Sequence, residues 1–370
     1  MRVYSILRSS LAVPLLVALT ACGGGLDYYS GPPPEMVLRG PEIAPDGSAI
    51  LLAFQFRNYA PKLAAIPTAP DGGDLVVFQA PPGLLWRDPT WSPDGDWFAA
   101  VSWCEGPDCY EGATGYNVWR LEIGGPTMER MSPVKDGVRR RDPVFGTSGD
   151  EIYYVESSTE FDGVGKYDIA DRSLIRVQHG HVQEIFPAPL ETIKFNGLLI
   201  NASVTQDRWL FVGTASPNGD HPFVAELVDG GFKYHDAMFS FSNGSFHLEK
   251  SFEVVDLHVS RTNPGYVFVR NVYPENKLRF EFYLSENGED RLLFDYANGH
   301  VQDISVSDDL KHLVFRGQRQ FNGPWAIWHY DIETGVLTDL QVPERLTEKV
   351  LRQIDEERGL RSAEAANALQ

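Results

Sequence analysis

The sequence predicts an all-β fold, a six-bladed β-propeller with four-stranded blades, followed by a short C-terminal helix. Over residues 36–342, short runs rich in Val, Ile, Phe, Tyr and Trp alternate with turns rich in Gly, Asn, Asp and Pro. A strand–turn–strand segment recurs about every 50 residues, which is typical of repeat architectures. A second hairpin follows each copy, and two hairpins together make one four-stranded sheet.

The clearest copy of the repeat is 88–101, where Ser92-Pro-Asp-Gly95 supplies the turn. Proline presets one turn position, Asp caps the turn and Gly takes the positive φ. The other copies are 41–53, 142–155, 256–269 and 303–315, with a degenerate copy near 201–212. Their anchor residues are Ile43, Trp91, Phe145, Val259 and Val306. We expect the second hairpins at 63–78, 118–131, 166–177, 223–234, 282–294 and 326–340.

The N-terminus has the layout of a secretory signal peptide over residues 1–21. Arg2 and Arg8 precede a short apolar run, and the segment ends in Leu19-Thr-Ala-Cys22. This ending resembles the lipobox of bacterial lipoproteins, which implies that Cys22 is the mature N-terminus and carries lipid such as palmitate. An ordinary cleaved signal is the alternative. No Asp follows Cys22, and the resemblance then implies the outer membrane, with the protein facing the periplasm. Residues 22–35, rich in Gly, Pro and Tyr, read as a flexible tether.

Cys104 and Cys109 form an even pair in an exported chain, and Gly106-Pro107 lies between them. We expect a local disulfide that stiffens a loop, because a turn brings the two sulfur atoms together. A thiolate metal site is the alternative, but no second Cys pair or nearby His offers further ligands.

The net charge of −19 argues against binding to nucleic acid and to anionic membrane surfaces. Attachment to a membrane is therefore expected through the lipid alone. We expect a monomer whose partners are envelope proteins or peptides, basic ones being the most compatible.

The Ser-Pro-Asp-Gly turn and the later Asp331-x-x-Thr-Gly335 hairpin resemble those of the six-bladed TolB-type propeller family. The resemblance covers roughly residues 36–342 and implies the fold more than any function. In the family's namesake the mouth of the channel accepts partner peptides, which implies a place for binding.

An acid stands three positions before the anchor in four copies, as Asp88, Asp142, Asp256 and Asp303. We expect these residues to start the innermost strands and to ring one mouth of the channel, with Glu184 joining them at the entry to the fourth blade. Like charges held so close repel unless a cation or a hydrogen-bond network lies between them. Two interpretations stay open: each Asp caps its own loop or bonds backbone amides of the next blade, or the ring binds a basic peptide segment or a metal ion.

Catalytic signals are sparse. The chain holds no Gly-x-Ser-x-Gly elbow, no phosphate loop and no zinc-helix motif. His181, His258 and His300 raise the possibility of a metal in the channel, as in some propeller lyases, but their spacing is not diagnostic. We expect no cofactor and no metal. A non-catalytic binding scaffold is favoured; the alternative is a metal-assisted polysaccharide lyase or hydrolase.

Residues 343–370 change in character. Leu346, Val350, Leu351 and Ile354 recur at helical spacing among charged residues. We expect a helix from about Glu344 to Arg358 that packs on the rim of the propeller or, alternatively, binds a partner.

Overall fold

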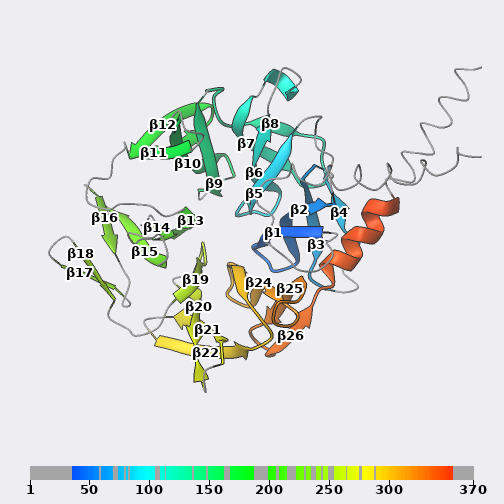
Figure 1. Ribbon diagram of the computed structural model, residues 1–370. Coiled ribbons are helices and arrows are strands. Elements are labelled where there is room, and N and C mark those ends of the chain that lie inside the picture. Colours follow the sequence, from blue (N-terminus) through cyan, green and yellow to red (C-terminus); the bar gives the residue numbers. More distant parts are fainter. Residues whose placement is uncertain are drawn as a thin grey trace, which may run out of the picture. The chain divides into compact units, whose positions relative to one another are not determined.

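The structure is a computed structural model, and its description covers residues 36–352 with gaps (Figure 1). The gaps are 58–59, 70–73, 79–80, 82–83, 105–108, 113, 136, 147–148, 162–166, 187–198, 206–207, 215–221, 229–230, 235–238, 243–244, 249–253, 264, 275–276 and 287–288. The expected signal peptide, tether and Cys22 lie outside the described residues.

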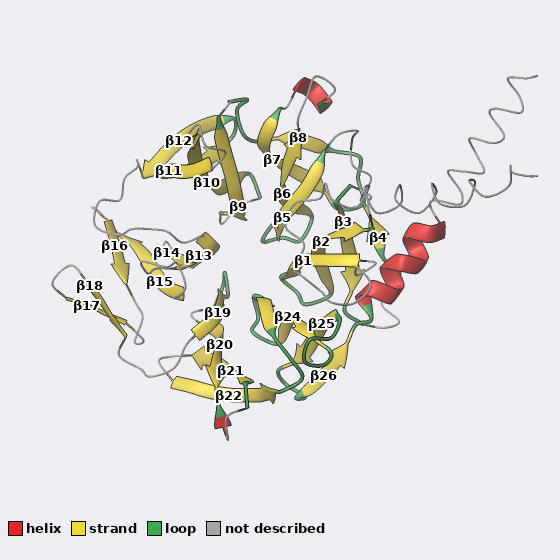
Figure 2. Ribbon diagram, in the orientation of Figure 1, coloured by secondary structure: helices red, strands yellow, loops and turns green. Residues whose placement is uncertain are grey.

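The described strands form six four-stranded antiparallel sheets, a number compatible with the six predicted blades (Figure 2). We call these sheets blades 1 to 6 in chain order. Blade 1 is β1 (Met36–Ile43), β2 (Ala49–Phe56), β3 (Lys62–Pro67) and β4 (Val76–Val77). Blade 2 is β5 (Leu85–Trp91), β6 (Trp97–Cys104), β7 (Gly115–Glu122) and β8 (Met128–Arg130). Blade 3 is β9 (Val138–Phe145), β10 (Glu151–Phe161), β11 (Tyr167–Gln178) and β12 (His181–Phe186).

The second half of the chain repeats this pattern. Blade 4 is β13 (Leu199–Thr205), β14 (Arg208–Thr214), β15 (Pro222–Val228) and β16 (Gly231–Tyr234). Blade 5 is β19 (Val254–Val259), β20 (Tyr266–Val272), β21 (Arg279–Glu286) and β22 (Glu289–Tyr296). Blade 6 is β23 (Val301–Val306), β24 (His312–Gln318), β25 (Trp325–Asp331) and β26 (Val336–Asp339). A separate two-stranded sheet, β17 (Phe239–Ser242) and β18 (Ser245–Leu248), stands between blades 4 and 5 in sequence, and a single 3₁₀ turn, η1 (Tyr110–Gly112), precedes β7.

The first strands of the blades contact one another in a closed cycle. β1 contacts β5, β5 contacts β9, β9 contacts β13, β13 contacts β19, β19 contacts β23, and β23 contacts β1. These six strands are therefore the inner strands of a β-propeller, and the fold class is the one predicted. Each blade is one continuous stretch of chain, so the first and last strands of the chain belong to different sheets.

Where side-chain burial is described, the hydrophobic core lies between neighbouring blades. One buried cluster joins blades 1 and 2 through side chains such as Leu51 and Trp86, and another joins blades 2 and 3 through Val101 and Tyr154. A third cluster joins blades 5 and 6, where Phe282 lies 4.7 Å from Phe315 between ring centroids.

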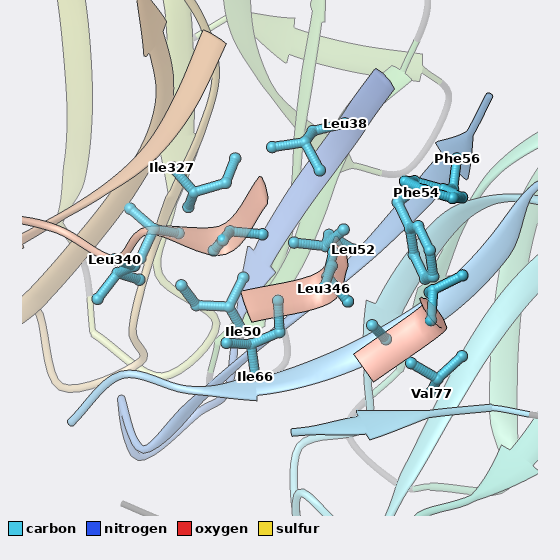
Figure 3. Close-up of a cluster of buried hydrophobic side chains, with 14 of the residues drawn as sticks. Leu38, Ile50, Leu52, Phe54, Phe56, Ile66, Val77, Ile327, Leu340 and Leu346 are labelled. Carbon is cyan, nitrogen blue, oxygen red and sulfur yellow. The ribbon is translucent and has the colours of Figure 1, made fainter. Parts of the chain in front are cut away.

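A helix over residues 342–352 covers blade 1. Leu346 lies in a buried cluster with Ile50 and Leu52 of blade 1 and Ile327 of blade 6 (Figure 3). Val350 is buried in the same cluster, whereas Leu351 is 39% exposed, and Ile354 lies outside the described residues. Val342, which the sequence interpretation missed, completes the buried stripe at the start of the helix.

The expected hairpin at 166–177 is wrong. Residues 167–178 form one strand, β11, which pairs with β10 on one side and with β12, over 181–186, on the other. The turn falls at His179-Gly180, where both residues have positive φ, beyond the end of the expected hairpin. The degenerate copy near 201–212 does form a hairpin, because β13 pairs with β14 there.

Candidate functional site

The repeated acid stands at a break in the pairing of the inner strand. In blades 1, 2, 3 and 6, two successive residues oppose one residue of the next strand, as in a β-bulge. The first of the two is left-handed, with φ of 53° at Gly40, 47° at Asp88, 50° at Asp142 and 53° at Asp303. Gly, Asn and Asp are the residues that adopt this conformation routinely. Asp88, Asp142 and Asp303 therefore have a backbone explanation, which does not extend to Asp256.

Two of these carboxylates link one blade to the next. Asp256 accepts hydrogen bonds from the backbone N–H of Leu257 at 2.8 Å and, in blade 6, of Ile304 at 3.0 Å. Asp88 accepts one from the backbone N–H of Asp142 in blade 3. Burial raises the pKa of Asp256 to about 7, and the charge of Asp303 adds to this, whereas the backbone hydrogen bonds oppose it.

The four acids do not start their strands as the sequence analysis expected. They lie inside the inner strands, at or beside the break in pairing; Asp88 is the fourth residue of β5. Position in the repeat predicted the correct strand for each acid. The predicted start of the strand was too late, because the strand begins before the bulge and continues through it.

Arginines of the chain itself lie among these acids. Arg316 Nε forms an ion pair with Asp303 Oδ2 at 3.0 Å. Asp88 is buried, which raises its pKa, and the charges of Arg87, Arg141 and Arg139 oppose that shift. Sequence reasoning missed these cations, although the signal was present. The bulge reads Arg39-Gly-Pro41, Arg87-Asp-Pro89 and Arg141-Asp-Pro143 in the first three blades. Proline suits the second bulge position because it has no N–H to pair.

Glu184 and the three histidines do not gather at the channel. Glu184 and His181 lie on β12, the outermost strand of blade 3, and not at the entry to blade 4. His300 stands just before β23 and contacts the rings of Phe280 and Phe321. Only His258 lies on an inner strand. Among the described residues, no group of three or more His, Cys, Asp or Glu side chains has a spacing that could hold a metal ion.

His258 belongs to a polar network that joins four blades. It lies one position before the anchor of blade 5, and Ser305, Glu42 and Thr90 hold the same position in blades 6, 1 and 2. His258 Nε2 is 3.3 Å from Ser305 Oγ and 3.7 Å from Glu42 Oε2. Thr90 Oγ1 donates to Glu42 Oε1 at 3.3 Å. The network thus passes from one inner strand to the next, from blade 5 through blades 6 and 1 to blade 2.

Ser305, His258 and Glu42 are the residue types of a hydrolytic triad, but their bonding differs from one. The backbone N–H of Val306 donates to His258 Nδ1 at 3.2 Å, so Nδ1 is unprotonated and the neutral ring carries its proton on Nε2. Nε2 then donates toward Ser305 and cannot accept the serine proton, as a general base must. Ser305 Oγ also accepts a bond from the backbone N–H of Ile43 at 3.1 Å. The side chains of Ser305 and His258 are both buried.

Arg261 connects two blades that are not neighbours in the cycle. It follows β19 in blade 5, and its Nη1 donates to the carbonyl oxygen of Trp91 in blade 2 at 2.6 Å. Its Nε bonds Asp308 Oδ1 of blade 6 at 3.0 Å. Arg261 therefore links blades 2, 5 and 6 at the end of the ring where the inner strands lead into the first turn of each blade.

The Cys104–Cys109 disulfide is present, as predicted, with a Cα–Cα distance of 5.9 Å. It ties the end of β6 to the loop that leads to β7. No helix among the described residues is long and apolar enough to cross a membrane.

Comparisons with known proteins bear on the fold alone. No family model and no curated protein matches the chain. Among solved structures, a puromycin-hydrolysing peptidase of Mycobacterium tuberculosis matches with a TM-score of 0.53 at 13% identity, over 83% of this chain and 53% of that one. Prolyl oligopeptidase B of Galerina marginata matches with a TM-score of 0.51 at 14% identity, over 83% and 51%. TolB of Acinetobacter baumannii has a TM-score of 0.48 at 13% identity, over 81% and 62%. The chain spans about half the length of the two peptidases.

Proposed function

We propose that this protein is a non-catalytic β-propeller that binds envelope proteins or peptides, held at the outer membrane by lipid on Cys22 and facing the periplasm. The observation that carries the proposal is the state of the inner strands. The side chains of Asp256, His258 and Ser305 are bonded to one another or to backbone amides across blades, so they serve as structural ties and leave His258 without a free basic nitrogen.

The anchor is testable at Cys22. We expect Cys22→Ser to shift the full chain from the detergent-soluble membrane fraction to the soluble periplasmic fraction, because the thiol that receives the lipid is gone. Fractionation with an antibody against the chain measures the shift, and Cys104→Ser is the control because it leaves the lipobox intact. A Cys22→Ser protein that still partitions wholly with membranes would contradict the anchor.

Binding is testable by cross-linking in intact cells that produce the full chain. We expect a discrete adduct with an envelope protein, and we expect His300→Gln and His258→Gln to retain it wherever the variant folds. In parallel, the purified chain is tested for bound transition metal and for cleavage of polysaccharides. A stoichiometric metal and a polysaccharide-cleaving activity that both variants reduce, with no adduct, would favour the alternative of a metal-assisted lyase or hydrolase.

A further inference from the structure

Three arginines gather where blades 2 and 3 meet. Arg87 lies on β5, and Arg139 and Arg141 lie on β9, the strand that contacts β5. The guanidinium carbons of Arg87 and Arg139 lie 5.2 Å and 5.6 Å from the centroid of the Tyr116 ring, so both cations contact one aromatic side chain. All four side chains are half-buried.

The positive charge of this cluster is only partly balanced within the described part of the chain. No carboxylate there lies within 4.0 Å of the three guanidinium groups, and Nε of Arg139 and of Arg141 has no hydrogen-bond partner. Asp88 and Asp142 are the nearby acids; the charge of Asp88 favours the protonated form of Arg139, and Asp88 already accepts a backbone hydrogen bond from Asp142. Burial, and then the charge of Arg141, lowers the pKa of Arg139. Half-buried cations of one sign destabilise each other, and an added anion would relieve this.

The adjoining loop is held in place by a covalent bond. Trp103 and Tyr116 are partners across β6 and β7, with ring centroids 6.2 Å apart, and the Cys104–Cys109 bond begins at the next residue. The disulfide therefore fixes the strand ends that carry the aromatic side chains beside the arginines. Such preorganisation favours binding because little order is lost when a ligand arrives.

We propose that Arg87, Arg139 and Arg141 form a binding site for a single carboxylate group of a partner peptide, a chain terminus or an acidic side chain. This inference rests on the proposed binding function and names the chemistry that one partner contact would have. A guanidinium group presents paired N–H donors that match the two oxygens of a carboxylate. The net charge of −19 repels extended polyanions, whereas a single carboxylate feels mainly the cluster within a Debye length of about 8 Å.

The test measures fluorescence polarisation of a labelled alanine pentapeptide with a free C-terminal carboxylate, added to the purified full chain in detergent. We expect saturable binding that weakens as salt rises, and we expect the amidated peptide to bind about tenfold more weakly or not at all, because its charge-assisted hydrogen bonds are lost. The variant Arg139→Gln/Arg141→Gln should lose a similar factor. The control Arg291→Gln/Arg352→Gln changes net charge equally at two exposed positions and should bind as the wild type does.

Three outcomes would overturn the inference: equal binding of the amidated peptide, equal loss in the control variant, or competition by inorganic phosphate that is far stronger than competition by acetate. Arg87→Gln alone provides a second variant should the double change disturb folding, which a thermal melt detects. If the cross-linked adduct in cells survives in a folded Arg139→Gln/Arg141→Gln protein while the peptide never binds, the carboxylate site fails and the proposed binding function stands.

Discussion

At the scale of single residues, the inner strands use one acid for two purposes. The left-handed conformation at the bulge favours Asp or Gly, and the carboxylate of Asp88 there accepts a hydrogen bond from a backbone amide of the next blade. Burial is the cost, since a charged carboxylate loses water when it is enclosed. Asp256 carries that cost most clearly, because its pKa is raised to about 7.

Asp256 should make stability depend on pH. Its carboxyl has a pKa of about 7 in the folded protein against 3.8 as the reference value. Between these values the folded state holds the proton more tightly than the unfolded state, so this residue contributes stability that decreases as pH rises toward 7. We expect Asp256→Asn, which keeps the size and one acceptor, to remove this contribution, so that from pH 4 to 7 the Tm of the variant falls less or rises more than that of the wild type.

Thermal melts of the wild type and of Asp256→Asn at several pH values measure how Tm changes with pH in each protein. The other acids titrate in both proteins, so their effect drops out of the comparison. The exposed Asp290→Asn is the control and should leave the slope unchanged. Identical slopes for wild type and Asp256→Asn would contradict the assignment.

At the scale of elements, the tight turns of the repeat connect blades as well as strands. In blade 1, Gly47 takes a φ of 74°, and a side chain added there would meet His312 of blade 6 at 2.0 Å. The equivalent Gly95 in blade 2 has a φ of 77° and nothing within 4 Å of an added Cβ atom. The same sequence motif thus has two different surroundings.

These two glycines form a matched pair for mutagenesis. We expect Gly95→Ala to lower the free energy of unfolding by about 1 kcal/mol, because only the left-handed backbone penalises alanine there. Gly47→Ala should cost a further 1–3 kcal/mol or so, since His312 must also shift. Urea unfolding measures both values. Equal losses would mean that the contact with His312 does not contribute.

The repeat made these elements predictable, and its limits explain what was missed. The Pro-Asp-Gly turns and the anchors such as Trp91 and Val306 identify hairpins, because turn chemistry is local. The error at 166–177 arose where one long strand occupies nearly the whole range that was expected to hold two strands and a turn. The partners of Glu42 and His258 could not be predicted, because they come from blades far apart in sequence.

The same distinction applies to the candidate site. The four acids were found by position in the repeat, but the arginines beside them were not recognised. Arg87 and Arg139 come together only when blades 2 and 3 meet around Tyr116. Position within one repeat carries no information about side chains that face each other across a blade boundary.

At the scale of the whole molecule, none of the described strands closes the ring by pairing the first and last blades in one sheet. The C-terminal helix contributes instead, because Leu346 and Val350 are buried with residues of blades 1 and 6. Arg345 Nη1 adds a bond to the carbonyl oxygen of Pro67 in blade 1 at 3.3 Å. The helix therefore acts as a clasp over the boundary between the first and last blades.

The clasp predicts where the molecule is most sensitive to truncation of a side chain. Leu346→Ala should lower the free energy of unfolding by about 2–5 kcal/mol, as removal of a fully buried leucine side chain does. Leu351→Ala, five residues later in the helix and partly exposed, should change the free energy of unfolding by no more than about 0.5 kcal/mol. Denaturant unfolding of both variants checks the contrast, and similar losses would show that the helix is not a clasp.

Because each blade is one continuous stretch of chain, the contacts that close the ring join residues nearly the whole length of the body apart. Arg316 Nη1 reaches the carbonyl oxygen of Leu38 across 278 positions, and Ile43 bonds Ser305 across 262. Contacts of such separation form slowly, since a long loop must be ordered before any of them is made. During synthesis the N-terminal residues appear first, so blade 1 is made first and the C-terminal helix that covers it is made last. Until the final helix arrives, the apolar face of blade 1 remains open to other chains, which makes the interval before completion the period of greatest exposure to aggregation and proteolysis.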